Sequence, residues 1–111
     1  MTRSADFGTT VKQGVRAVQP DLVVHAYRDL SSPDGPQIGF VVTKAIGGAV
    51  ERHRVARRLR HLIGAVLNDL EPTDRIVVRA LPGSRDAKSQ RLQQELTEAL
   101  RRSRQLLEQA R

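Results

Sequence analysis

Short apolar runs, separated by turn signals, predict the strands of this chain. The runs are rich in β-branched and aromatic residues, which is typical of short strands in a small sheet. In chain order they are Val15–Val18, Leu22–Arg28, Gln37–Thr43 and Arg75–Leu81. Ser31–Pro36 carries a strong turn signal, so we expect the second and third runs to pair as an antiparallel hairpin.

Three other segments show a helical period. From Ala49 to about Asn68, apolar residues recur on one face, and Ser89 to about Ala110 repeats the pattern. A shorter helix is predicted over Ser4–Gln13, with Phe7 and Val11 on one side. The chain is therefore expected to be an α+β protein, a single domain over residues 1–111 in which helices pack on a small sheet.

The apolar stripes of the two long helices define the expected core. The first stripe consists of Val55, Leu59, Leu62, Ile63 and Val66. The second consists of Leu92, Leu96, Ala99, Leu100, Ser103, Leu106 and Leu107.

The net charge of the chain indicates what kind of partner it binds. Nineteen Lys and Arg against twelve Asp and Glu leave +7, which indicates a polyanion such as nucleic acid or an anionic membrane. Sixteen of the nineteen cations are arginine, which binds phosphate with two parallel hydrogen bonds. A GC-rich genome would also favour arginine codons, so the bias alone does not decide the matter.

Most of the excess charge lies in one segment. Lys44 to His61 holds six Lys and Arg against the single acid Glu51. A solvated helix face usually mixes both signs, because like charges three or four residues apart repel. We therefore expect the outer face of this helix to bind phosphate. Arg52 shares the angle of the apolar stripe, where a guanidinium needs a partner.

Other classes of function fit less well. The aliphatic face of the basic helix is needed to cover the sheet, which argues against membrane binding. No short helix precedes it as in a helix-turn-helix, so DNA is not expected. There is no cysteine, signal peptide or apolar run of ~18 residues. Metal-ligand, paired-carboxylate and phosphate-loop motifs are also missing. A cytoplasmic protein that binds rather than catalyses is expected.

The stretch "TKAIGGAVERHRVARRLRHLI" resembles the signature of the protein subunit of bacterial ribonuclease P. That family shows a strand, a lysine, an "IG-x-AV" turn and an "RNR" helix. "DF" at Asp6–Phe7, Gly14, the "LVV" strand and Pro82 also follow the family's order. The resemblance implies the element order αβββαβα, a left-handed crossover around the basic helix, and a likeness to a domain of a small-subunit ribosomal protein.

The resemblance also implies a function. In this family the RNA subunit binds the catalytic Mg²⁺ and removes the 5′ leader of precursor tRNA, and the protein assists as a monomer in a 1:1 complex. The implied positions for binding the RNA subunit are Lys44, Arg52, His53, Arg54, Arg57, Arg58, Arg60 and His61. The implied positions of the leader cleft are Arg3, Phe7, Val11 and His25.

Several positions depart from the family pattern. His53 replaces the usual Asn, and Ala56 replaces a usual Lys. Val11 and His25 stand where a Phe and a Tyr are common, and Arg79 lies one residue early, which reverses its face on a strand.

Two other functions remain open. A structural RNA-binding protein of the ribosomal type would share the charge and the small α+β fold. A protein nuclease is the third alternative.

Overall fold

The computed structural model describes residues 12–31 and 35–109. The strands are β1 (Val15–Val18), β2 (Leu22–Arg28), β3 (Gln37–Val41) and β4 (Asp74–Ala80). The long helices are α2 (Ala49–Ile63) and α3 (Ser89–Gln109), and short 3-10 turns lie at η1 (Leu67–Asp69) and η2 (Pro82–Arg85). The described elements follow the expected order from the first strand onward. Most of the predicted first helix lies outside the described residues.

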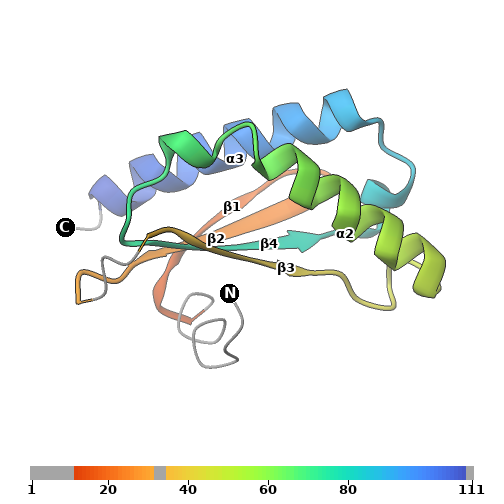
Figure 1. Cartoon of the computed structure of the whole chain (residues 1–111), viewed down its shortest axis with the longest axis horizontal. Helices are drawn as coiled ribbons and strands as arrows, with labels where there is room; N and C mark the ends of the chain where they lie inside the picture. The colour runs from red at the N-terminus through yellow and green to blue at the C-terminus, as the bar shows by residue number, and fades with distance from the viewer. Residues whose placement is uncertain (1–11, 32–34, 110–111) are drawn as a thin grey trace.

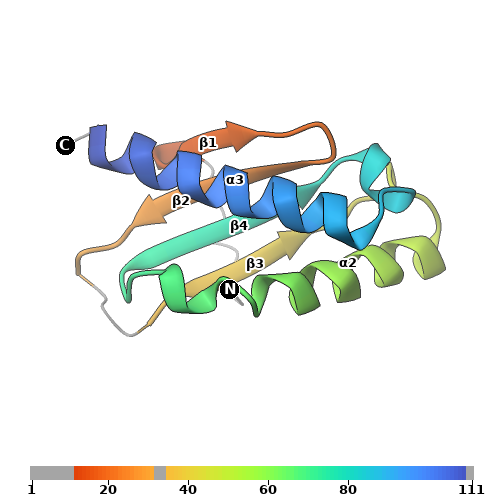
Figure 2. The same cartoon turned by 90° about the horizontal axis from the view of Figure 1, so that it is seen from above.

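The four strands form one sheet in the order β1-β2-β4-β3, and both helices cover the same face of it (Figure 1). β2 pairs antiparallel with β1 and with β4, whereas β3 pairs parallel with β4. The chain leaves β3, returns through α2 and enters β4 beside β3, and this crossover is left-handed (Figure 2). Most β-α-β connections are right-handed, so strand and helix periodicity alone does not predict this arrangement.

The predicted hairpin of the second and third runs is wrong, because β4 lies between β2 and β3. Ile76, Val77 and Val78 of β4 are at most 2% exposed, so this strand is buried on both faces. A strand of this kind needs covering on both sides and two neighbouring strands, which places it inside the sheet. The turn signal at Ser31–Pro36 predicted a change of direction but not the partner strand.

One apolar core joins the sheet to both helices. Leu22 and Val24 of β2, Leu59 of α2, and Leu92 and Leu96 of α3 are at most 1% exposed. These residues belong to the predicted stripes and to the alternating inner side of the strand. The core therefore fixes which side of each element faces solvent.

α2 is shorter than predicted. It ends at Ile63, and Gly64 follows as its C-cap, because glycine is a poor helix former. Turns then lead into η1, yet Val66 still packs into the core at 9% exposed. The apolar period therefore continued beyond the helix itself.

Candidate nucleic-acid interface

The loop before α2 sets where the basic helix begins. Ile46 is 2% exposed and anchors the loop in the core, while Lys44 in the same loop is exposed. Gly47 has φ +151°, and a Cβ there would lie 3.1 Å from Cβ of Glu51 in the first turn of the helix. Glycine is therefore required at this position, and the turn brings Lys44 close to the start of α2.

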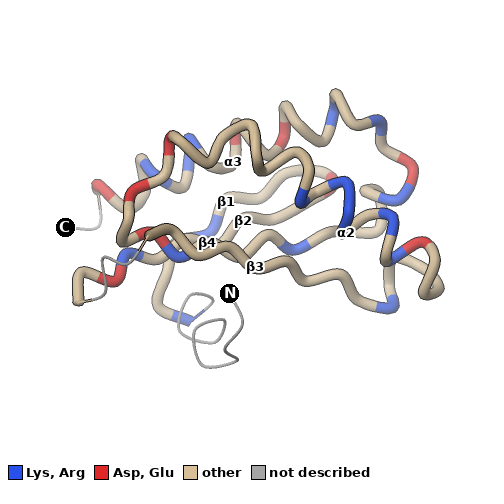
Figure 3. Tube along the Cα trace, viewed as in Figure 1, with Lys and Arg blue, Asp and Glu red and all other residues tan. Residues whose placement is uncertain are grey.

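The core side of α2 determines where its arginines point. Val55, Leu59, Leu62 and Ile63 are buried against the sheet and α3. Apart from Ala49 and Val50 in its first turn, the exposed positions of the same helix are His53, Arg54, Arg57, Arg60 and His61. We call these five residues, with Lys44, the basic face; Figure 3 marks its Lys and Arg positions on the trace.

The arginines of the basic face have no internal partner. In the part of the chain that the structure describes, Arg54, Arg57 and Arg60 form no hydrogen bond or ion pair. Like charges three and four residues apart repel by a few tenths of a kcal/mol per pair. An external polyanion is the partner that would relieve this repulsion.

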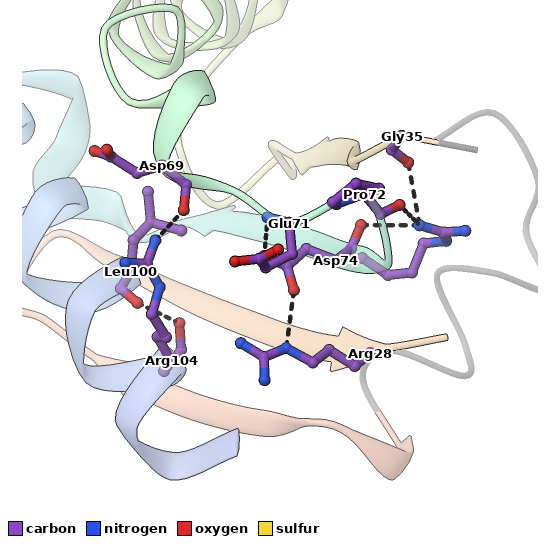
Figure 4. A network of polar contacts seen from close by, with 10 residues as sticks. Arg28, Gly35, Asp69, Glu71, Pro72, Asp74, Leu100 and Arg104 are labelled. Carbon is purple, nitrogen blue, oxygen red and sulfur yellow. Dashed lines mark hydrogen bonds and ion pairs between the residues drawn. The ribbon is translucent and has the colours of Figure 1, made fainter. Parts of the chain in front are cut away.

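Other arginines are engaged inside the protein (Figure 4). Nε of Arg28 lies 3.3 Å from Oδ1 of Asp74, whose Oδ2 accepts the N–H of Glu71 at 2.9 Å. Arg75 is 4% exposed and donates to the carbonyl oxygens of Gly35, Pro72 and Asp74, and Arg104 donates to that of Asp69. The contacts of Arg28 and Arg75 tie the start of β4 to its surroundings, and that of Arg104 ties α3 to η1, so these arginines have structural roles.

Arg91 joins a carboxylate pair at the turn between β1 and β2. Its Nε lies 2.8 Å from Oδ2 of Asp21 and 3.3 Å from Oε2 of Glu95. Glu95 also accepts the backbone N–H of Asp21 at 2.8 Å. Burial first, and then the side-chain contact with Asp21, raise the pKa of Glu95, although the N–H of Asp21 acts in the opposite direction. Sequence reasoning missed this buried acid, because it lies beside the apolar stripe of α3.

Two of the predicted RNA-binding arginines, Arg52 and Arg58, are less exposed than the arginines of the basic face. Nη1 of Arg58 donates to the carbonyl oxygen of Ala87 at 2.6 Å, which ties α2 to the segment before α3. Arg52 is partly buried, and its Nε has no hydrogen-bond partner among the described residues. The expectation that Arg52 needs a partner therefore stands, and no described side chain provides one.

Of the predicted leader-cleft residues, only His25 is among the described residues. Arg3, Phe7 and Val11 are outside the described residues. His25 of β2 alternates with core residues, so it lies on the sheet face opposite the helices, 8% exposed. The structure therefore separates His25 from the basic face of α2.

His25 lies near two cations that were not among the predicted site residues. Arg16 is its register partner on β1, and Arg79 is the partner of the nearby Val23 on β4. Burial first, and then the charges of Arg16 and Arg79, lower the pKa of His25. Both arginines are exposed, and their alternation with core residues in the strands was the signal that would have revealed this second basic surface.

The described residues offer no evident metal site. They contain no group of three or more His, Cys, Asp or Glu placed to hold an ion, so their side chains do not fit a protein-bound Mg²⁺. Within the same residues, no helix combines the length and apolar character needed to cross a bilayer.

A family model described as Ribonuclease P matches residues 1–104. The chain belongs to the ribonuclease P protein family. The ribonuclease P protein component of Mycobacterium avium is 62% identical over 106 residues, covering 92% of this chain and 88% of that protein. The Mycobacterium tuberculosis component is 53% identical over 103 residues, covering 93% and 87%.

Solved structures of ribonuclease P proteins share the fold. The Staphylococcus aureus protein superposes with a TM-score of 0.81 at 24% identity, covering 91% of each chain. The Thermotoga maritima protein gives 0.79 at 20% identity, covering 92% of this chain and 97% of that one. The fold prediction is confirmed by these likenesses.

Removing Arg58 and removing Arg57 should affect stability differently. Arg58→Ala loses the hydrogen bond to Ala87 and should lower the free energy of unfolding by about 1 kcal/mol. Arg57→Ala removes an unpaired charge and should leave it within about 0.5 kcal/mol, because surface changes of this kind are nearly neutral. Urea unfolding of both variants measures the difference, and equal effects would contradict a structural role for Arg58.

We expect the free energy of unfolding to decrease as the pH falls, partly because of His25. Its pKa in the folded chain is below the ordinary 6.5, so the unfolded chain takes up a proton first as pH drops below 6.5. Wild type should therefore lose stability relative to His25→Asn as the pH falls from 7.5 through this window. Urea unfolding at several pH values tests this, and a difference that stays constant with pH would contradict it.

Proposed function

We propose that this chain is the protein subunit that binds the catalytic RNA of ribonuclease P and the 5′ leader of precursor tRNA. In that role it would assist cleavage that leaves the mature 5′ end of the tRNA. The observation that carries the proposal is the basic face of α2, whose arginines lack partners among the described residues, in a chain of this family. We expect it to act in the cytoplasm, where precursor tRNA is made.

The proposed contact with RNA is mainly electrostatic. Arg54, Arg57 and Arg60 would each neutralise a phosphate and release a counterion, which makes binding dependent on salt. Arg52 would offer its unsatisfied Nε to an RNA oxygen after turning toward it. Lys44, His53 and His61 extend the same exposed surface, and Arg58 holds it against the segment before α3.

The leader is proposed to bind on the other side of the sheet. Arg16 and Arg79 lie exposed beside the buried His25 and place cations on this strand surface, which suits a single-stranded backbone. We propose that Arg3, Phe7 and Val11 add to this surface, with Phe7 offering a ring on which a base can stack. Basic surfaces on different sides of the sheet would let one subunit of a 1:1 complex contact two RNAs at once.

The chemistry of cleavage is assigned to the RNA. The described side chains do not form a metal centre, so the proposal gives them the tasks of binding and positioning. Mg²⁺, held mainly by the RNA subunit, would supply the activated water and charge stabilisation. The family match favours this role over that of a structural protein of the ribosome.

Reconstitution tests the proposal directly. The protein is mixed with bacterial ribonuclease P RNA and precursor tRNA at a Mg²⁺ concentration too low for the RNA alone. We expect the protein to restore cleavage and to tighten substrate binding. If it does neither, the proposed function is wrong, and cleavage by the protein without the RNA would instead support a protein nuclease.

A further inference from the structure

An open groove of about 480 Å³ runs between α2 and β3, on the opposite side of the sheet from His25. β3 is an edge strand of the sheet, and α2 lies alongside it (Figure 2). The β3 side of the groove is apolar, with Phe40 and Val42 facing it, and α2 contributes the cations Arg52 and Arg60 together with the polar His53. One wall therefore suits a flat apolar group and the other suits an anion.

Small side chains on α2 keep the groove open. Ala49 and Ala56 both line it. A longer side chain at position 56 would occupy part of this space. In this chain the cations therefore flank the space instead of filling it.

Arg52 is the second indication that the groove binds a ligand. Its Nε is buried beside the groove and has no acceptor among the described residues. A buried N–H without an acceptor is unfavourable, so an occupant that supplies an oxygen would be stabilised when the side chain turns to meet it. The group that Arg52 lacks is thus a hydrogen-bond acceptor, and the cationic wall of the groove favours an anionic one.

We propose that the groove binds one unstacked nucleotide of the ribonuclease P RNA subunit. This inference rests on the proposed function and names the group that the α2 edge recognises. The base packs against Phe40 and Val42, and its phosphate contacts Arg52 and Arg60. Single-stranded RNA is commonly bound in this way, by an aromatic or apolar surface for the base and cations for the backbone. The volume falls within the range of about 300–1,000 Å³ that is usual for sites of this size of ligand.

Filling the groove without changing charge is the sharpest test. Ala56→Leu places a larger apolar side chain in the space and leaves every cation present. The affinity for the isolated RNA subunit should fall about tenfold, which corresponds to losing one stacked base, while the slope of log affinity against log salt stays unchanged. Ala65→Leu, at an exposed position outside the groove, is the matched control and should bind as wild type does.

The outcomes separate this inference from the proposed function. If wild type binds the RNA subunit and Ala56→Leu binds it equally well, the groove proposal is overturned and the proposed function stands. If Ala56→Leu weakens the binding of precursor tRNA alone and not of the RNA subunit, the assigned occupant is wrong. If wild type does not bind the RNA subunit, the proposed function itself fails.

A second variant guards against misfolding. If Ala56→Leu loses its cooperative unfolding transition, Phe40→Leu is measured in its place, since it keeps an apolar side chain but removes the ring. The same loss of affinity without a change of slope is expected. Wild-type affinity in Phe40→Leu would overturn the proposed packing of the base.

Discussion

The packing of α2 on the sheet is the interaction on which the rest of the structure depends. Val55, Leu59, Leu62 and Ile63 are buried there, each side chain contributing about 2 kcal/mol when removed from water. The outer face of the same helix carries like charges that repel by a few tenths of a kcal/mol per pair. Burial exceeds repulsion several-fold, so the helix forms with Arg54, Arg57 and Arg60 directed outward and without a partner among the described residues.

Net charge is a coarse guide to function in this protein. Arg28, Arg75 and Arg91 are engaged with carboxylates or carbonyl oxygens of the chain itself. Arg54 and Arg57 have no such partner in the described residues, although all five contribute equally to the total of +7. What separates the two groups is the presence of an internal acceptor, and this requires the structure.

The left-handed crossover explains how a single helix can pack on the core and still expose its basic face. It places α2 beside the edge strand β3 rather than over the middle of the sheet (Figure 2). The other helix, α3, packs over β1 and β2. At the edge, one flank of the helix meets the core and the others remain exposed. The groove between α2 and β3 follows from the same placement.

Sequence periodicity predicted the described strands and long helices, because burial imposes a period on each. It did not predict that β4 separates β2 from β3, since alternation shows which face is buried and not which strand is adjacent. The continuous apolar run of Ile76 to Val78 was the available signal for a central strand. Gly64 was likewise a signal for the end of α2, although the apolar period continues beyond it to Val66.

The candidate site was predictable in part. The direction of Arg54, Arg57 and Arg60 followed from the helical period, and these positions are exposed in the structure. Arg58 could not be separated from them, because its acceptor Ala87 lies 29 residues away. The grouping of His25 with Arg16 and Arg79 depends on strand register, which the sequence does not specify.

The central claim is that the unpaired arginines of α2 are the phosphate contacts. The most direct measurement is the salt dependence of affinity for ribonuclease P RNA in Arg57→Ala and in Arg102→Ala, an exposed position of equal charge on α3. The account predicts that Arg57→Ala lowers the log–log slope by about 1, whereas Arg102→Ala leaves it unchanged. Equal slopes for the two variants would contradict the account.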